Sequence, residues 1–399
     1  MTVRGLGRWG RRGRTPEHAS DGQTLLVDHW YSHAVGHVIE ALRRCQGYHA
    51  CDPTLRIALV LNRASPTELV ACAGFVSEAF AVPYTSFGAP AGSPRRALQR
   101  VPRDWDFVVH HPAAFDPEEQ RFEGLRRYFE ASRRHFRARV ALGVAGQPPP
   151  AYAPHQQLRL ALPEAERAGA AAELGGRRTI AVMPAGSGAR YLYPSTASWL
   201  EILDELQRRF PDAAFALVGR LDQGGGRTSS GITRGEVERL LASRSGTVDA
   251  FDRPILEQLA IVEASSLFVS PHTGFGFAAV AVETPWLTLS GGDWPEYFFN
   301  GVPFHSVLPK SRDVPAFVHS RSLPMIDDDS DGEGPRSATM SVARIREDLD
   351  ELGDASERLV ARDVSYEEAL ASYFPQLLDA YGGDRSLIRS FDDAHLGYV

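Results

Sequence analysis

The stretch that decides the fold is Ser270-Pro-His-Thr-Gly-Phe-Gly-Phe-Ala-Ala-Val-Ala-Val-Glu-Thr-Pro-Trp-Leu-Thr-Leu-Ser290. The residues just before it, 267–269, are apolar and β-prone, and 286–289 near its end have the same character. Between these two runs, 271–276 is typical of a turn, and the alanine-rich residues 277–282 favour a short helix that a Thr-Pro pair ends. The stretch therefore predicts a βαβ unit with its glycine turn at the carboxyl edge of a parallel sheet.

The start of this short helix is a candidate site for an anion. The first amides of a helix have no intrahelical acceptor and carry the positive end of the helix dipole, which favours a phosphate. Gly274 and Gly276 would let a ligand approach the backbone closely. The alternative is that both glycines only make a tight turn.

The same alternation of strand and helix extends along the whole chain, which predicts parallel sheets covered on both faces. In the first half we expect strands at 24–29, 55–61, 82–86 and 107–110, with helices at 36–44, 65–80 and 117–139. In the second half we expect further strands at 178–183, 214–218 and 248–250, with helices at 196–210, 236–243 and 255–263. The predicted fold class is α/β, with two Rossmann-like doubly wound domains facing a central cleft.

The chain has 399 residues, which is too long for one ordinary core. The expected organisation is a disordered basic tail, an N-terminal Rossmann-like domain, a linker, a C-terminal Rossmann-like domain, a mobile acidic insertion and terminal helices. The tail is expected at 1–23, the N-terminal domain at 24–150 and the linker at 151–175. The C-terminal domain is expected at 176–310, the insertion at 311–341 and the terminal helices at 342–399.

Composition narrows the class of protein. Hydrophobic residues make up 43% and charged residues 23%, as in a soluble globular protein, and the net charge of −7 disfavours nucleic acid as a partner. Cys45, Cys51 and Cys72 cannot all pair and lack zinc spacing, which fits a reducing cytoplasm. No apolar run reaches transmembrane length, and no apolar segment follows the N-terminal arginines. We therefore expect a cytoplasmic protein without stable membrane insertion or a secretory signal.

Three glycine turns are expected at the carboxyl edge of the second sheet, namely 184–190, 219–226 and 271–276. Together they could hold a diphosphate and a nucleoside. Arg190 and Arg220 are candidate charge partners for the phosphates, although each could equally form a surface salt bridge.

At these residues the sequence resembles GT-B glycosyltransferases, in particular the heptosyltransferase-like branch, glycosyltransferase family 9. Residues 271–285 resemble the family's Asn-Asp-Ser-Gly-Pro-x-His-Leu-Ala-Ala-Ala-x-Gly-Thr-Pro, with the same spacing from the small hydroxyl residue to Thr-Pro. Residues 184–187 resemble its Pro-Gly-Ala-Ser turn, and 290–295 resemble its Phe-Gly-Pro-Thr-Asp-Pro. Residues 36–38 resemble its Gly-Asp-Val turn, so the resemblance covers about residues 24–309.

The resemblance implies transfer of a sugar from a nucleotide diphosphate donor to the hydroxyl of a small-molecule or glycan acceptor. It implies no metal at the reacting centre, and we expect no cofactor. Asp293 or Glu296 is expected to accept hydroxyls of the donor sugar, and the alternative for each is a structural role. The expected donor-binding residues are Ser187, Gly188, Arg190, Arg220, His272, Thr273, Gly274, Phe275, Gly276 and Asp293.

The sequence departs from the family at three positions. His272 stands where the family has Asp, and Tyr191 stands where it has a basic residue, so Arg190 would have to substitute. The acidic base is replaced by His37, and a histidine with its ordinary pKa of roughly 6.5 suits removal of a proton near neutral pH. His37 is therefore the first candidate for the catalytic base, unless it is an ordinary helix-start histidine. Rivals near the same turn are His33, Asp28 and His29.

Two other functions fit the same sequence. A nucleotide-sugar epimerase shares the two-domain shape and would convert the donor without an acceptor. A non-catalytic sugar-nucleotide-binding partner protein would explain why the family's acidic and basic positions are replaced.

Overall fold

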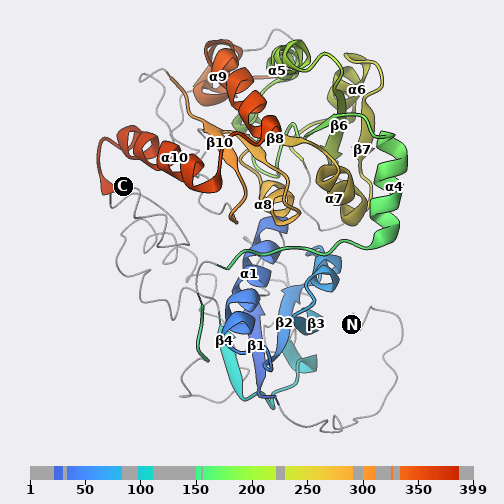
Figure 1. Ribbon diagram of the computed structural model, residues 1–399, viewed down its shortest axis with the longest axis vertical. Coiled ribbons are helices and arrows are strands. Elements are labelled where there is room, and N and C mark those ends of the chain that lie inside the picture. Colours follow the sequence, from blue (N-terminus) through green and yellow to red (C-terminus); the bar gives the residue numbers. More distant parts are fainter. Residues whose placement is uncertain are drawn as a thin grey trace. The chain divides into compact units, whose positions relative to one another are not determined.

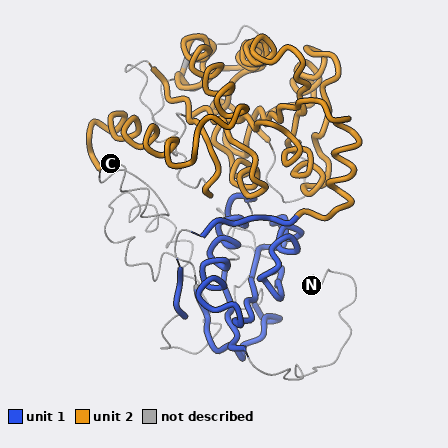
Figure 2. Tube along the Cα trace, viewed as in Figure 1, with its two compact units in different colours: residues 1–120, 126–161 blue, residues 121–125, 162–399 orange. Residues whose placement is uncertain are grey.

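The computed structural model describes residues 22–29, 34–82, 98–110, 150–153, 156–221, 230–290, 300–310, 325–326 and 333–385. These residues form two compact units, which divide between Ala161 and Leu162 (Figure 2). Each unit has its own parallel sheet, and each is described by itself below.

The first unit is built on a four-stranded parallel sheet in the order β3-β2-β1-β4. Helix α1 (Val35–Cys51) packs against β1 and β2 (Figure 1). Its buried face includes Val38, Ile39 and Leu42, spaced as one side of a helix. The strands are β1 (Thr24–His29), β2 (Arg56–Asn62), β3 (Val76–Val82) and β4 (Phe107–His110).

The helix predicted over 65–80 is wrong. The chain forms only a short 3₁₀ helix, η1 (Thr67–Cys72), and then enters β3, which pairs in parallel with β2. Gly74 lies between the two elements, where a glycine favours a turn over a continuous helix. The strand predicted at 82–86 contributes only its first residue to β3, since the rest of it lies outside the described residues. The helix predicted at 117–139 also lies outside them.

The second unit is built on a six-stranded parallel sheet in the order β10-β9-β8-β5-β6-β7. Numbered from the first strand of this unit, the order from β7 to β10 is 3-2-1-4-5-6, the doubly wound order of a Rossmann domain. All strands except β10 lie where we predicted strands. Their bounds are β5 (Thr179–Val182), β6 (Ala214–Gly219), β7 (Val248–Phe251), β8 (Leu267–Pro271), β9 (Trp286–Leu289) and β10 (Phe304–Val307).

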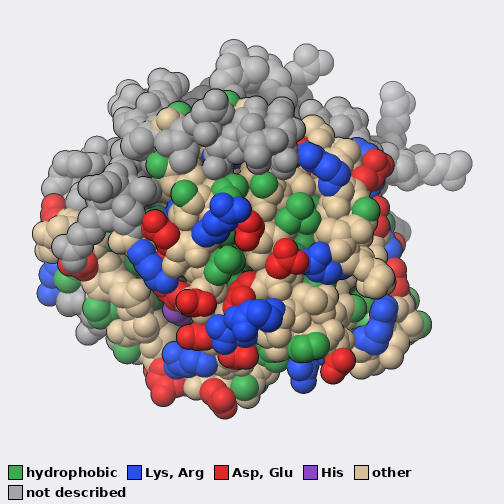
Figure 3. Space-filling model, turned by 90° about the horizontal axis from the view of Figure 1, so that it is seen from above, with side chains coloured by type: hydrophobic (Ala, Val, Ile, Leu, Met, Phe, Trp, Pro, Cys, Tyr) green, Lys and Arg blue, Asp and Glu red, His purple; other side chains and the backbone are tan. Residues whose placement is uncertain are grey.

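Helices cover this sheet in two groups (Figure 1). One group packs α7 against α4, α8, β5 and β6, and the other packs α5 against α6 and α9. Ion pairs join α5 and α9, including Arg209 to Glu357 and Arg346 to Glu201, and Figure 3 shows acidic and basic side chains interspersed on that face. The bounds are α4 (Glu164–Leu174), α5 (Thr196–Arg209), α6 (Arg234–Ala242), α7 (Ile255–Glu263), α8 (Gly274–Ala281), α9 (Val342–Ala361) and α10 (Tyr366–Ala380).

The last part of the predicted mobile insertion is buried, so the bound at Ser341 is wrong. Strand β12 (Arg336–Ser337) pairs with β11 (Met325–Ile326), and the 3₁₀ helix η7 (Ala338–Met340) follows. Met340 is 1% exposed and Arg336 is 2% exposed. The reason is electrostatic, since the Arg336 guanidinium is paired with Glu333 at 2.8 Å and so can be buried despite its charge.

Helix α9 is anchored to the sheet by a buried charge. Arg344 donates to the carbonyl of Val307, at the end of β10, at 2.6 Å and pairs with Asp348 one turn on. Helix α9 begins at the start of the predicted terminal helices, 342–399, and runs to Ala361. Within the described residues, no helix is both long and apolar enough to cross a lipid bilayer.

Candidate functional site

The carboxyl ends of β5 and β8 mark the point where the strand order of the second sheet reverses. In doubly wound folds, ligands bind in the crevice outside such a switch point. The turn 184–190 leaves the end of β5, and α8 begins directly after β8. Two of the three predicted glycine turns therefore flank the switch point.

The start of α8 is capped by its own threonine. The hydroxyl of Thr273 accepts a hydrogen bond from the Gly276 N–H at 3.1 Å, and Thr273 is 3% exposed. Its neighbours His272 and Gly274 are half-buried and so reach solvent. The cap fixes the direction of the first amides, and the solvent contact of Gly274 leaves a face on which an anion can lie.

Gly186 is where three loops meet. A Cβ atom on Gly186 would lie 3.0 Å from the Thr273 side chain, so the turn after β5 touches the start of α8. The Gly186 carbonyl also accepts a hydrogen bond of 2.7 Å from the N–H of Gly231, which returns from the loop after β6. The structure thus brings the predicted turns 184–190 and 271–276 together with Gly231, which follows the third predicted turn, 219–226.

The side chain of Tyr193 holds the turn at 184–190 in place through a hydrogen bond. Its hydroxyl accepts from the Gly188 N–H at 2.5 Å, and Tyr193 itself is buried. A Cβ atom on Gly188 would lie 2.6 Å from the same hydroxyl, so this position requires glycine. Ser187 and Gly188 remain exposed above the ring. The turn is therefore held rigidly while its outer surface is open to a ligand.

Gly276 has a structural role. A Cβ atom there would lie 2.2 Å from the indole of Trp286, so the glycine allows α8 to pack on β9. Trp286 in turn donates to Ser270 at 2.9 Å. Phe275 is also buried, 6% exposed. Among the predicted donor-binding residues 272–276, His272 and Gly274 are the ones that solvent reaches.

Arg190 and Arg220, the candidate charge partners for the phosphates, have different neighbours. Arg190 is paired with the carboxylate of Glu236 and lies 3.8 Å from that of Glu333. Two acidic side chains therefore neutralise the guanidinium that we expected to meet phosphate. Arg220 follows β6, and its backbone N–H donates to Ser230 at 3.2 Å while its side chain is half-buried.

In the first unit, four ionisable side chains lie at or near the carboxyl end of β1. Nδ1 of His37, in the first turn of α1, is 3.1 Å from Oε2 of Glu40, and the His37 side chain is 25% exposed. The ring of His29 lies 6.2 Å from that of His37 and is 1% exposed. Asp28 is 4% exposed. Of these histidines and Asp28, His37 is the most accessible to a substrate.

The contact between His37 and Glu40 favours the ionised form of the Glu40 carboxyl. Burial works against ionisation of Glu40, but the hydrogen bond from His37 and the charges of His29, His37 and Arg44 outweigh it and lower the pKa of the Glu40 carboxyl. An ionised carboxylate only accepts, so Nδ1 of His37 is the donor. In the neutral ring this leaves the lone pair on Nε2.

Two predicted site residues, His33 and Asp293, lie outside the described part of the chain, as does Glu296. Three site residues were missed by the sequence analysis: Glu40, Glu236 and Glu333. The sequence contained a local pattern that could have identified two of them. Glu40 follows His37 at the i, i+3 spacing of helix neighbours, and Glu236 completes a capping box with Thr233. Nothing in the polar segment before Arg336 indicated that Glu333 would be buried.

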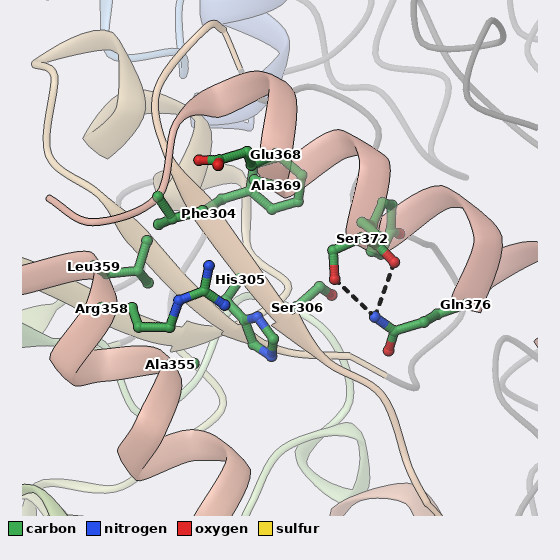
Figure 4. Close-up of a pocket in the computed structure, with 12 residues that line it drawn as sticks. Phe304, His305, Ser306, Ala355, Arg358, Leu359, Glu368, Ala369, Ser372 and Gln376 are labelled. Atoms are coloured by element: carbon green, nitrogen blue, oxygen red, sulfur yellow. Dashed lines mark hydrogen bonds between the residues drawn. The ribbon is translucent and has the colours of Figure 1, made fainter.

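A separate hollow lies between β10, α9 and α10, lined by His305, Ser306, Arg358, Ser372 and Gln376 (Figure 4). Its volume of about 30 Å³ has room for little more than a water molecule. It contains none of the predicted donor-binding or catalytic residues and is too small for a nucleotide.

No protein-family model matches this sequence, and no curated protein matches it. Solved structures do match it. A glycosyl transferase family 9 protein from Veillonella parvula shares 11% identity with a TM-score of 0.53, covering 86% of this chain and 98% of that chain. Two E. coli proteins have lower TM-scores. ADP-heptose LPS heptosyltransferase II shares 16% identity with a TM-score of 0.48, covering 84% of this chain and 99% of that chain. Heptosyltransferase WaaC with ADP shares 13% identity with a TM-score of 0.49, covering 84% of this chain and 99% of that chain. The Veillonella match and the two doubly wound sheets show an α/β fold of the GT-B type.

Proposed function

We propose that this protein is a glycosyltransferase that moves a sugar from a nucleotide diphosphate donor to an acceptor hydroxyl, without a metal at the reacting centre. The second unit would bind the donor, and the first unit would supply the base. The acceptor is a small molecule or a glycan, and the compartment is the cytoplasm, in keeping with cysteines that are all unpaired.

The meeting of three loops at Gly186 is the observation that carries the proposal. The exposed Ser187–Gly188 turn, the residues after β6 and the half-buried His272–Gly274 segment converge at the switch point. Backbone amides at such a point stabilise the negative charge of a diphosphate. In the reaction they stabilise the same group as it leaves, which is the electrostatic part of catalysis.

His37 is the proposed base. Its Nε2 lone pair would accept the proton of the acceptor hydroxyl as the oxygen forms a bond to the anomeric carbon of the sugar. The bond from that carbon to the diphosphate breaks, and the electron pair leaves with the nucleotide diphosphate. Glu40 holds Nδ1 at 3.1 Å, fixes the orientation of the ring and stabilises the imidazolium that forms.

One observation favours the non-catalytic alternative. Arg190 is neutralised by Glu236 and Glu333, so the cation expected beside the donor phosphates is already paired. A protein that only binds a sugar nucleotide has less need of this charge than one that stabilises a leaving diphosphate.

The test is a thermal-shift screen with ADP, UDP, GDP and CDP, followed by turnover assays with the matching sugar nucleotides. A ligand that binds only the folded state raises the melting temperature by mass action. Stabilisation by one nucleotide diphosphate, together with its release only when acceptor is present, would support a transferase. Donor conversion without acceptor would indicate an epimerase, and binding without turnover would indicate a partner protein. No stabilisation by any of them would refute the donor site.

A further inference from the structure

His29, His37 and Glu40 form a compact set of metal-binding side chains. One ligand atom from each residue lies within 4.8 Å of the other two. His29 ends β1, and the other two residues occupy the first turns of α1, so the three side chains project from rigid elements. Small side-chain rotations would bring such atoms to bonding distance of one ion, about 2.0–2.2 Å for nitrogen and oxygen ligands of zinc.

The types of ligand in this cluster indicate which metal ion it would prefer. Two imidazoles and one carboxylate are the ligands of Zn²⁺ and Fe²⁺ sites that keep an open coordination position. Hard cations such as Mg²⁺ prefer oxygen ligands and are not matched by two histidines. Zn²⁺ is therefore the best match among common ions.

Burial adds an independent observation. Oε1 of Glu40 is buried and accepts no hydrogen bond from the described residues, while Oε2 faces His37. A buried carboxylate oxygen without a hydrogen-bond donor is unfavourable, and a cation would satisfy it. His29, 1% exposed, closes the other side of the cluster from water.

We propose that His29, His37 and Glu40 form a binding site for a divalent transition-metal ion, with Zn²⁺ as the preferred ion. The proposal rests on this geometry and is independent of the proposed transferase reaction. It has a consequence for that reaction, however. A metal on one nitrogen of His37 leaves the proton on the other, so the metal-bound ring cannot serve as a base. The site would therefore be inhibitory.

The experiment uses the full chain without an affinity tag, because a histidine tag binds the same ions. After chelator treatment, Co²⁺ is titrated in and followed by its visible absorption, and Zn²⁺ is then added as a competitor. We expect saturable Co²⁺ absorption that Zn²⁺ abolishes. His29→Ala and the nearly isosteric Glu40→Gln should each weaken Co²⁺ binding by roughly tenfold or more, since even outer-shell changes cost that much.

His305→Ala is the matched control. His305 also faces a carboxylate, that of Glu351 at 2.9 Å, but belongs to no set of three ligands among the described residues. It should bind Co²⁺ like the wild type. Absence of Co²⁺ binding by the wild type, or equal binding by Glu40→Gln, would overturn the site. Transfer assays decide the separate question: activity lost with chelator would refute the metal-free reaction, whatever the Co²⁺ result.

Discussion

His37 is the residue on which the proposed chemistry most depends. His37→Ala removes the base and leaves the donor loops of the second unit unchanged. We expect turnover to fall by about 10²–10⁴-fold, the usual contribution of general base catalysis. Donor affinity, measured by calorimetry, should stay within about twofold, because the proposed donor-binding loops belong to the second unit and His37 belongs to the first.

The control for this substitution is His305→Ala, which removes a half-buried histidine that also faces a carboxylate but is not among the predicted site residues. It should turn over normally. Turnover of His37→Ala at the wild-type rate would rule out His37 as the base and return attention to His33 and Asp28.

Gly276 tests the packing of α8 on β9. Because a Cβ atom at this position would lie 2.2 Å from Trp286, Gly276→Ala forces the indole or the helix to move. We expect unfolding free energy to fall by about 1–3 kcal/mol, as for other overpacked cores. Chemical denaturation measures this change.

Gly169→Ala is the comparison, since Gly169 lies in α4 and a Cβ atom there would meet nothing within 4 Å. In a helix interior that change should stabilise by roughly 0.5–1 kcal/mol. Destabilisation by both alanines, or by neither, would contradict the packing explanation.

At the residue scale, the sequence predicted the turns that follow β5 and β8 but not the charged side chains around Arg190. The glycine and threonine positions follow from local backbone needs, so 184–190 and 271–276 could be predicted. The pairing of Arg190 with Glu236 and Glu333 depends on residues far along the chain, and no local pattern reports it. Glu40 was within reach, because helix spacing places it beside His37.

At the element scale, Glu333 fastens the β12–η7 segment to α5. Its carboxylate accepts from the backbone N–H of Thr196, at the start of α5, at 3.0 Å and pairs with Arg336 at 2.8 Å. Glu333→Gln keeps the shape but removes the charge, so the buried Arg336 loses its counter-ion. We expect a loss of about 1–3 kcal/mol in unfolding free energy. Glu201→Gln, in an exposed pair with Arg346, should change stability by less than about 1 kcal/mol.

The same contact predicts how stability depends on acid. Burial opposes ionisation of Glu333, but the hydrogen bonds from Thr196 and the charge of Arg336 lower the pKa of its carboxyl. A group with a lower pKa in the folded state stabilises the protein above its unfolded pKa, near 4.3, and this stabilisation is lost as pH falls through the folded value. Glu333→Gln should therefore destabilise at pH 7 and converge with the wild type in acid. A constant difference across pH would contradict this assignment.

Elements were predicted well where burial is continuous and poorly where it is not. β2 has a continuous aliphatic run, β8 begins with the apolar run Leu-Phe-Val, and both runs are buried, as in a central parallel strand. β3 lies at the edge of its sheet, and its middle residues are partly exposed. Its apolar residues, together with those of η1, also fit one face of a helix, and the decisive contact is the pairing with β2, which the local sequence does not contain.

At the scale of the whole molecule, the two proposed ligands are expected to bind to different units. The nucleotide diphosphate should bind the second unit, and Zn²⁺ the first. If each sheet unfolds with its own core, calorimetry should resolve two transitions, one raised by the nucleotide and the other by Zn²⁺. Gly276→Ala should lower only the transition that the nucleotide raises. Movement of both transitions by either ligand would show that the units unfold as one cooperative block.

The contacts of α9 with the second sheet also determine when the second unit can fold during synthesis. β10 is the last strand of the second sheet, yet its end is bonded to Arg344, and α9 covers β8, β9 and β10. During synthesis the ribosome must therefore release most of the polypeptide before that core can close. The first unit, which ends at Ala161, can fold on the ribosome well before then. Until α9 emerges, the nascent second sheet exposes an apolar face, which is the surface that a chaperone would bind.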